Sequence, residues 1–201
     1  KNFFNMANNK LAIIGGSGLY DVEEFKNREL IELDTSWGKP SDKILKTKYK
    51  DKEVCFLPRH GRGHFISPSK INFRANIDAF KQLGVTDIVS VSAVGSLKEN
   101  LFPGKFVIID QFIDRTFARN KTFFDEDIVA HVSMAHPTSK GLMNACEEAI
   151  KKEKGNKAVK LRLIIFTDSS TSESITRKAS TTPYPREKWI LRQMKVAMGN
   201  E

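Results

Sequence analysis

Short apolar runs, separated by polar or glycine-rich segments, recur along the first half of the chain. The first run, Leu11-Ala12-Ile13-Ile14, is unbroken and contains two β-branched residues, which is typical of a strand buried on both faces. Further strands are predicted where apolar residues alternate or cluster: Leu30–Leu33, Ile44–Tyr49, Glu53–Leu57, Thr86–Val91 and Phe106–Asp110.

Two helices are predicted from helical spacing and end signals. Phe73, Ile77 and Phe80 recur at the spacing of a helix over 73–83, which Asn72 caps and Gly84 ends. A second helix covers Gly141–Lys154, with Ser139 or Thr138 as its cap. Strands that alternate with helices predict an α/β fold, and the early meander of strands makes its twisted sheet mixed.

The pattern changes from about Gly155 onward. Residues 159–167 have the composition of a strand and residues 189–198 that of a short basic helix, but residues 168–185 are mostly Ser, Thr and Pro without apolar periodicity. We therefore expect one domain over residues 10–154, and a divergent, poorly ordered tail over residues 155–201.

Composition narrows the class of protein. The 201 residues carry a formal net charge of +9, but the lysines are scattered and form no basic stripe interleaved with aromatic residues, so nucleic acid is not the expected partner. No apolar run reaches the roughly 20 residues of a membrane span, and the first residues lack the apolar core of a signal peptide. Two cysteines form no disulfide framework, which favours the reducing cytoplasm.

Three predicted strands end in residues that suit an anion. Gly15-Gly16-Ser17-Gly18 follows the first strand and offers backbone N–H groups and a hydroxyl. Arg59 and His60 follow the strand 53–57, and Ser92 follows the strand 86–91. A guanidinium fork, an imidazole donor and hydroxyls together can hold a phosphate at the carboxyl ends of strands.

Other interpretations of the same residues are weaker or remain open. The glycine turn lacks the Gly-Lys-Ser/Thr ending of a P-loop, and Asp21 stands where a dinucleotide fingerprint needs a small residue. A lone arginine is often a surface ion pair and a lone histidine a structural side chain. His131 and His136 lack further metal ligands at suitable spacing, so no metal is expected. No nucleophile elbow is present around Ser17.

Taken together, the loops resemble the nucleoside phosphorylase superfamily, and within it the methylthioadenosine phosphorylase family. Six segments occur in the order of that family between about residues 10 and 154: IIGGSGLYD (13–21), TSWGKPSD (35–42), LPRHGRGH (57–64), PSKINFRANI (68–77), SVSAVGSLKE (90–99) and PGKFVIIDQFIDRT (103–116). Six segments in one order are a far more specific signal than a glycine turn alone.

The resemblance implies a three-layer, purine/uridine phosphorylase-like fold and a pentosyltransferase of purine and methionine salvage. Such an enzyme converts methylthioadenosine and inorganic phosphate into adenine and 5-methylthioribose-1-phosphate, with no cofactor. The family's phosphate-binding positions carry over to Ser17, Arg59, His60, Ser92 and Ala93. His131 matches a substrate-binding position that reaches into the neighbouring subunit's pocket, which implies a homotrimer.

The family's later segments, which bind ribose, purine and one side of the phosphate, are not legible in residues 155–201. We therefore expect an incomplete C-terminal part, from a frameshift or a truncated gene with a foreign tail. Three functions remain open: methylthioadenosine phosphorolysis, phosphorolysis of a 6-oxopurine nucleoside or methylthioinosine, and a catalytically incomplete fragment that binds phosphate or nucleoside.

Overall fold

The computed structural model describes residues 10–16, 25–49, 52–114, 116–117, 119–120, 122–124, 127–152 and 159–161. They fall into two compact units divided between Ser92 and Ala93, and each is described by itself. The predicted division near residue 154 stays a prediction. So does the fate of the tail, because apart from residues 159–161 the expected strand 159–167, the segment 168–185 and the helix 189–198 lie outside the described residues.

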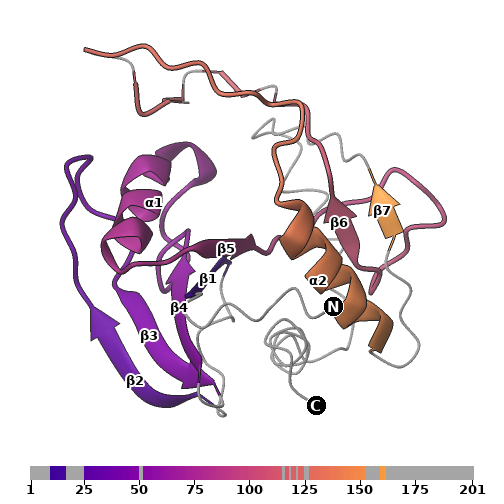
Figure 1. The fold of residues 1–201 in the computed structure, drawn as a ribbon, viewed down its shortest axis with the longest axis horizontal. Coiled ribbons are helices and arrows are strands. Elements are labelled where there is room, and N and C mark those ends of the chain that lie inside the picture. Colours follow the sequence, from indigo (N-terminus) through magenta and orange to yellow (C-terminus); the bar gives the residue numbers. More distant parts are fainter. Residues whose placement is uncertain are drawn as a thin grey trace. The chain divides into compact units, whose positions relative to one another are not determined.

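The first unit is built on a five-stranded mixed sheet with the order β2-β3-β4-β1-β5 (Figure 1). Strands β2 and β3 pair antiparallel, as do β3 and β4, whereas β1 pairs parallel with both β4 and β5. The bounds are β1 Leu11–Gly15, β2 Lys26–Ile31, β3 Ile44–Tyr49, β4 Lys52–Pro58 and β5 Asp87–Ser90. The predicted mixed α/β sheet is confirmed.

Strand β2 lies several residues before its predicted position of 30–33. It is an edge strand whose residues 27–30 are exposed, and a register irregularity separates Lys26 from Glu29. A solvated edge strand needs no apolar alternation, and bulges and charges keep such an edge from pairing with other chains. The sequence pattern therefore pointed to the apolar residues that follow the start of the strand.

Helix α1 (Phe73–Gln82) packs on the sheet through a buried face formed by Ala75, Asn76, Ala79 and Phe80. Ala79 and Phe80 belong to the same apolar core as Ala12, Ile14 and Leu57 of the sheet. The sequence predicted that Phe73, Ile77 and Phe80 share the apolar face of this helix. Phe73 and Ile77 are each 40% exposed, so only Phe80 of the three enters the core. A short 3₁₀ turn, η1 (Pro68–Lys70), precedes the helix.

The second unit contains β6 (Val107–Ile109), β7 (Val159–Leu161) and helix α2 (Lys140–Lys152). Strands β6 and β7 pair parallel, and α2 contacts β6. Of the two predicted caps of α2, Ser139 is the one used, because its hydroxyl accepts the N–H of Leu142 at 3.4 Å. Among the described residues, no helix is long and apolar enough to cross a membrane.

Candidate anion site

The parallel strands bring three loops to one edge of the sheet. Gly15, the last residue of β1, lies opposite Pro58, the last residue of β4, and Ile14 lies opposite Ser90, the last residue of β5. Backbone bonds extend this alignment past the strand ends, because Arg59 N–H donates to Gly15 O and Val91 N–H donates to Ile14 O, both at 2.9 Å. The glycine turn, the Arg59 turn and the Ser92 loop therefore start side by side.

Arg59 lies against the first glycine turn. A Cβ built on Gly16 would lie 4.0 Å from Arg59 Nη2, so the guanidinium occupies space that a side chain at Gly16 would approach. Arg59 Nη1 donates to Val91 O at 2.9 Å, which ties the side chain to the loop after β5. The guanidinium is thus fixed between two of the three loops.

Burial lowers the pKa of Arg59, and no carboxylate of the described residues pairs with its guanidinium. An arginine side chain nevertheless keeps its charge at neutral pH, because its ordinary pKa lies so far above 7. A partly buried cation without an anionic partner is favourable when a ligand supplies the negative charge. The geometry around Arg59 therefore suits an oxyanion.

His60 is buried in the same turn. Its Nδ1 lies 2.8 Å from Ile66 O, and its ring stacks on that of His64 with centroids 4.5 Å apart. Burial lowers the pKa of His60, the backbone bond to Ile66 raises it, and the charges of Arg59 and His64 lower it further. The lowered pKa favours the neutral imidazole at physiological pH.

The structure describes some of the remaining predicted site residues and not others. Ser17 lies outside the described residues, although Gly16 before it is next to Arg59. Ser92 is exposed and follows Val91, whose carbonyl accepts from Arg59. Ala93 and His131 are exposed residues of the second unit. The structure thus brings Arg59 to the glycine turn, with His60 next to it in the chain and Ser92 on the adjoining loop.

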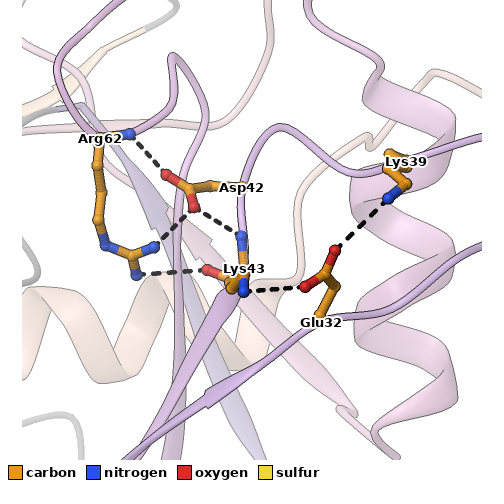
Figure 2. Close-up of polar contacts among 5 residues, drawn as sticks. All are labelled: Glu32, Lys39, Asp42, Lys43 and Arg62. Carbon is orange, nitrogen blue, oxygen red and sulfur yellow. Dashed lines mark hydrogen bonds and ion pairs between the residues drawn. The ribbon is translucent and has the colours of Figure 1, made fainter.

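Sequence reasoning missed a polar network beside this turn. Asp42 accepts from both the backbone and the guanidinium of Arg62, and the buried side chain of Asn76 holds Ser41 (Figure 2 shows the Asp42 contacts). A signal for these residues was present in the sequence. Asp42 is the last residue of one family-like segment (35–42), and Arg62 lies within another (57–64). Asn76 is a polar residue within the apolar stripe of a helix. Only the fold shows that these residues meet.

Among the described residues, no three His, Cys, Asp or Glu side chains gather as metal ligands would. Cys55 and Cys146 are free, and burial raises the pKa of both thiols, so they stay protonated at neutral pH.

Curated proteins of known name are similar in sequence to this chain. Curated relatives named S-methyl-5'-thioadenosine phosphorylase include one from Rhodospirillum rubrum, 56% identical over 140 residues, and one from Hyperthermus butylicus, 58% identical over 127 residues. These alignments cover 70% and 63% of this chain, and 48% and 46% of the relatives. The chain thus spans about half the length of the curated relatives it matches.

Solved structures that are similar to this chain carry the same enzyme name as the curated relatives. A methylthioadenosine phosphorylase from an antarctic soil metagenomic library has a TM-score of 0.73 at 38% identity, covering 90% of this chain and 67% of its own. A methylthioadenosine phosphorylase from Schistosoma mansoni in complex with adenine has a TM-score of 0.73 at 29% identity, covering 95% and 86%. The family profile of the phosphorylase superfamily matches residues 10–199, and the chain belongs to that superfamily.

Proposed function

We propose that the chain is the phosphate-binding part of a methylthioadenosine phosphorylase, which cleaves methylthioadenosine with inorganic phosphate into adenine and 5-methylthioribose-1-phosphate. The observation that carries this proposal is the place of Arg59, next to the glycine turn at the carboxyl edge of three parallel strands. The curated relatives at 56% and 58% identity bear the name of this activity.

Each residue of the site has a role that its chemistry supports. The Arg59 fork holds two phosphate oxygens, His60 donates to a third, and the hydroxyls of Ser17 and Ser92 with the N–H of Ala93 complete the shell. Phosphate then attacks C1′ as the bond between C1′ and the purine nitrogen breaks, so that positive charge builds on the ribose and adenine leaves with the electron pair and takes up a proton. Orientation of the anion and electrostatic stabilisation of that charge account for the acceleration.

Adenine is the base that this proposal assigns, and the support comes from a relative. The Schistosoma mansoni methylthioadenosine phosphorylase was solved with adenine bound, and its fold matches this chain with a TM-score of 0.73. Methylthioadenosine is therefore the substrate we expect the site to serve. Methylthioinosine and 6-oxopurine nucleosides are the substrates to compare with it.

We also propose that the protein assembles as a homotrimer in which His131 reaches the substrate site of a neighbouring copy. Large apolar side chains around His131 are strongly exposed in the second unit, among them Ile128, Val129 and Val132. Exposed apolar groups gathered on one segment are typical of a surface that another chain covers. A second copy of this chain is the partner that completes the proposed site.

The decisive experiment mixes the purified chain with methylthioadenosine and inorganic phosphate and follows adenine by chromatography, with phosphate binding measured in parallel by calorimetry. Adenine release that depends on phosphate supports phosphorolysis. Phosphate binding without adenine release supports the alternative that this chain is an incomplete binding fragment. Absence of phosphate binding contradicts the proposal itself. Replacing methylthioadenosine with methylthioinosine in the same assay tests the base.

A further inference from the structure

The Arg59–His64 turn is held at its far end by one carboxylate. Asp42 Oδ2 accepts the backbone N–H of Arg62 at 2.6 Å, and Asp42 Oδ1 accepts Arg62 Nη1 at 2.7 Å (Figure 2). The two side chains are only 15% and 30% exposed, respectively. Charge-assisted bonds of this kind are shorter and stronger than neutral ones, and partial burial limits their screening.

The turn relies on this external partner because of its own backbone. Gly61 and Gly63, on either side of Arg62, have φ of +72° and +88°, and His64 has φ of +59°. Within the turn, Gly61 N–H donates to Pro58 O at 2.9 Å and His64 N–H donates to Gly61 O at 3.1 Å. The N–H of Arg62 instead leaves the turn and donates to Asp42.

Asp42 is in turn anchored to the hydrophobic core. Ser41 N–H donates to Asn76 Oδ1 at 2.7 Å, and Asn76 Nδ2 donates to Ser41 Oγ at 3.0 Å. Asn76 is fully buried on helix α1. The carboxylate next to Ser41 is therefore placed by the helix that packs on the sheet, and not by a free surface loop.

We propose that Asp42 is a positioning residue for the anion site, which it serves by fixing the turn that carries His60. This inference rests on the proposed phosphate-binding role. Arg59 has anchors of its own, Gly15 O and Val91 O. The ring of His60 depends on the turn, since its side-chain contacts are Ile66 O and the ring of His64, which follows Arg62 closely, although the His60 carbonyl also accepts the Ile66 N–H at 3.0 Å. Loss of Asp42 thus acts through His60.

Glu32 is the matched control. Its carboxylate pairs with Lys39 Nζ at 3.5 Å and with Lys43 Nζ at 2.9 Å. Figure 2 shows that Lys43 also meets the Asp42–Arg62 pair, but through its backbone, which donates to Asp42 Oδ1 at 2.7 Å and accepts from Arg62 Nη2 at 3.3 Å. Removing either carboxylate changes the net charge by the same amount. Removing a negative charge near an anion site strengthens phosphate binding by electrostatics alone. Weaker binding in an Asp42 variant therefore has the sign of lost positioning.

The test titrates inorganic phosphate into the purified full chain by calorimetry and records the ¹⁵N-labelled histidine rings by NMR. We expect Asp42→Ala to raise the phosphate Kd about ten-fold, because small displacements of a positioned group are costly. Asp42→Asn keeps an amide oxygen for the Arg62 N–H and should lose less. Glu32→Ala should leave the Kd within about two-fold of wild type. The His60 ring signals should move in Asp42→Ala and stay in Glu32→Ala.

The outcomes separate this inference from the proposed function. Phosphate binding that is equal in wild type and Asp42→Ala overturns the positioning role and leaves the proposed function standing. Equal losses in Asp42→Ala and Glu32→Ala overturn it as well. A wild-type chain that binds no phosphate overturns both. If circular dichroism shows that Asp42→Ala does not fold, the same comparison is decided by Asp42→Asn.

Discussion

Burial sets the protonation state of His60. The side chain is 8% exposed, and burial together with nearby positive charge outweighs the backbone bond to Ile66 and lowers the pKa of the ring. A neutral ring whose Nδ1 meets a carbonyl must carry its proton there, which leaves Nε2 free of a proton. A phosphate dianion raises the pKa of a neighbouring imidazole, so we expect phosphate binding to be coupled to proton uptake.

The free energy of unfolding should fall as the pH is lowered from 7 toward 5, partly because of His60. Its pKa is lower in the folded chain, so the unfolded chain binds the proton more readily. The stabilisation is complete above the ordinary pKa of 6.5 and is lost as the pH falls through the folded-state pKa. His60→Asn, which keeps an N–H donor for Ile66 O, should flatten this dependence in urea titrations.

Arg59→Ala should raise the phosphate Kd by more than about ten-fold, because it removes both the charge and the fork that fit an oxyanion. Arg59→Lys keeps the charge without the fork, so its phosphate Kd should lie between those of wild type and Arg59→Ala. Arg74, which stacks on Trp37 with its guanidinium carbon 4.3 Å from the ring centroid, supplies the control Arg74→Ala. Phosphate titration of the three variants measures the order, and unchanged binding in Arg59→Ala would falsify the assignment.

Sequence alone pointed to Arg59 and His60 because both follow an apolar strand, and parallel strands align their ends. Their role in binding an anion stays a prediction. The sequence did not single out Asp42 or Arg62, since each resembles an ordinary exposed charge within its own loop. Their contact depends on how helix α1 places the loop before β3, and no local pattern encodes that placement. Ser17 stays a prediction.

At the scale of elements, helix α1 is defined by signals at both ends. Asn72 Oδ1 accepts the N–H of Ala75 at 3.1 Å, as predicted. At the other end Gly84 N–H donates to Lys81 O at 2.9 Å and Val85 N–H donates to Phe80 O at 3.0 Å. This pair of bonds is a Schellman motif, which requires the left-handed backbone that Gly84 adopts with φ of +73°.

Gly84→Ala should therefore destabilise the chain by about 1 kcal/mol. Nothing lies within 4 Å of a Cβ added there, so the cost is that of the left-handed backbone and not of a clash. Gly141→Ala is the opposite case, since Gly141 lies within helix α2 and its Cβ would meet Ser139 Oγ only at 3.8 Å. That change should stabilise by about 0.5 kcal/mol. Denaturant midpoints of the two variants, shifted in opposite directions, check both.

Phe80→Ala should cost about 3–5 kcal/mol, because Phe80 is fully buried between helix α1 and the sheet. Ile77→Ala, on the same helix at a position 40% exposed, should cost about 1 kcal/mol or less. Thermal or urea unfolding distinguishes them. Similar losses at the two positions would show that the packing face of α1 is wrong.

Element prediction succeeded where burial imposes a pattern. Strand β3 has its predicted bounds, β1 and α1 deviate by one residue at one end, and β4 and β5 deviate by one residue at each end. Strand β6, at Val107–Ile109, is shorter than the predicted strand 106–110. Strand β2 and the buried face of α1 were misjudged, because an edge strand faces water and because alanines and one asparagine, not the larger apolar residues, line most of the helix contact.

At the scale of the whole molecule, the sequence predicted a mixed α/β sheet but not its order. The pairing of β1 with both β4 and β5 depends on contacts between residues far apart in the chain, which local patterns do not contain. The family resemblance, in contrast, covers most of the chain and pointed to the superfamily whose profile matches residues 10–199. The division between Ser92 and Ala93 was not predicted from the sequence.

The proposed homotrimer can be tested at the scale of the whole molecule. If a second copy covers the apolar segment around His131, the double change Val129→Ser with Val132→Ser should shift the protein from trimer to monomer, because it removes exposed apolar area from the contact. Sedimentation velocity at several protein concentrations measures this. The exposed Leu97 lies outside that segment, so Leu97→Ser should leave assembly unchanged. A wild-type chain that sediments as a monomer at every concentration would contradict the trimer.

Strand β1 lies between β4 and β5, and this place has a consequence for the synthesis of the protein on the ribosome. Translation delivers Leu11–Gly15 first, yet both neighbours of this strand, Lys52–Pro58 and Asp87–Ser90, leave the exit tunnel much later. Until then the nascent chain exposes an apolar segment with both backbone edges open, a condition that invites chaperone capture or clumping. The pairing of β2, β3, β4 and β1 can precede the last strand, and the sheet of the first unit is complete only after Ser90 has emerged.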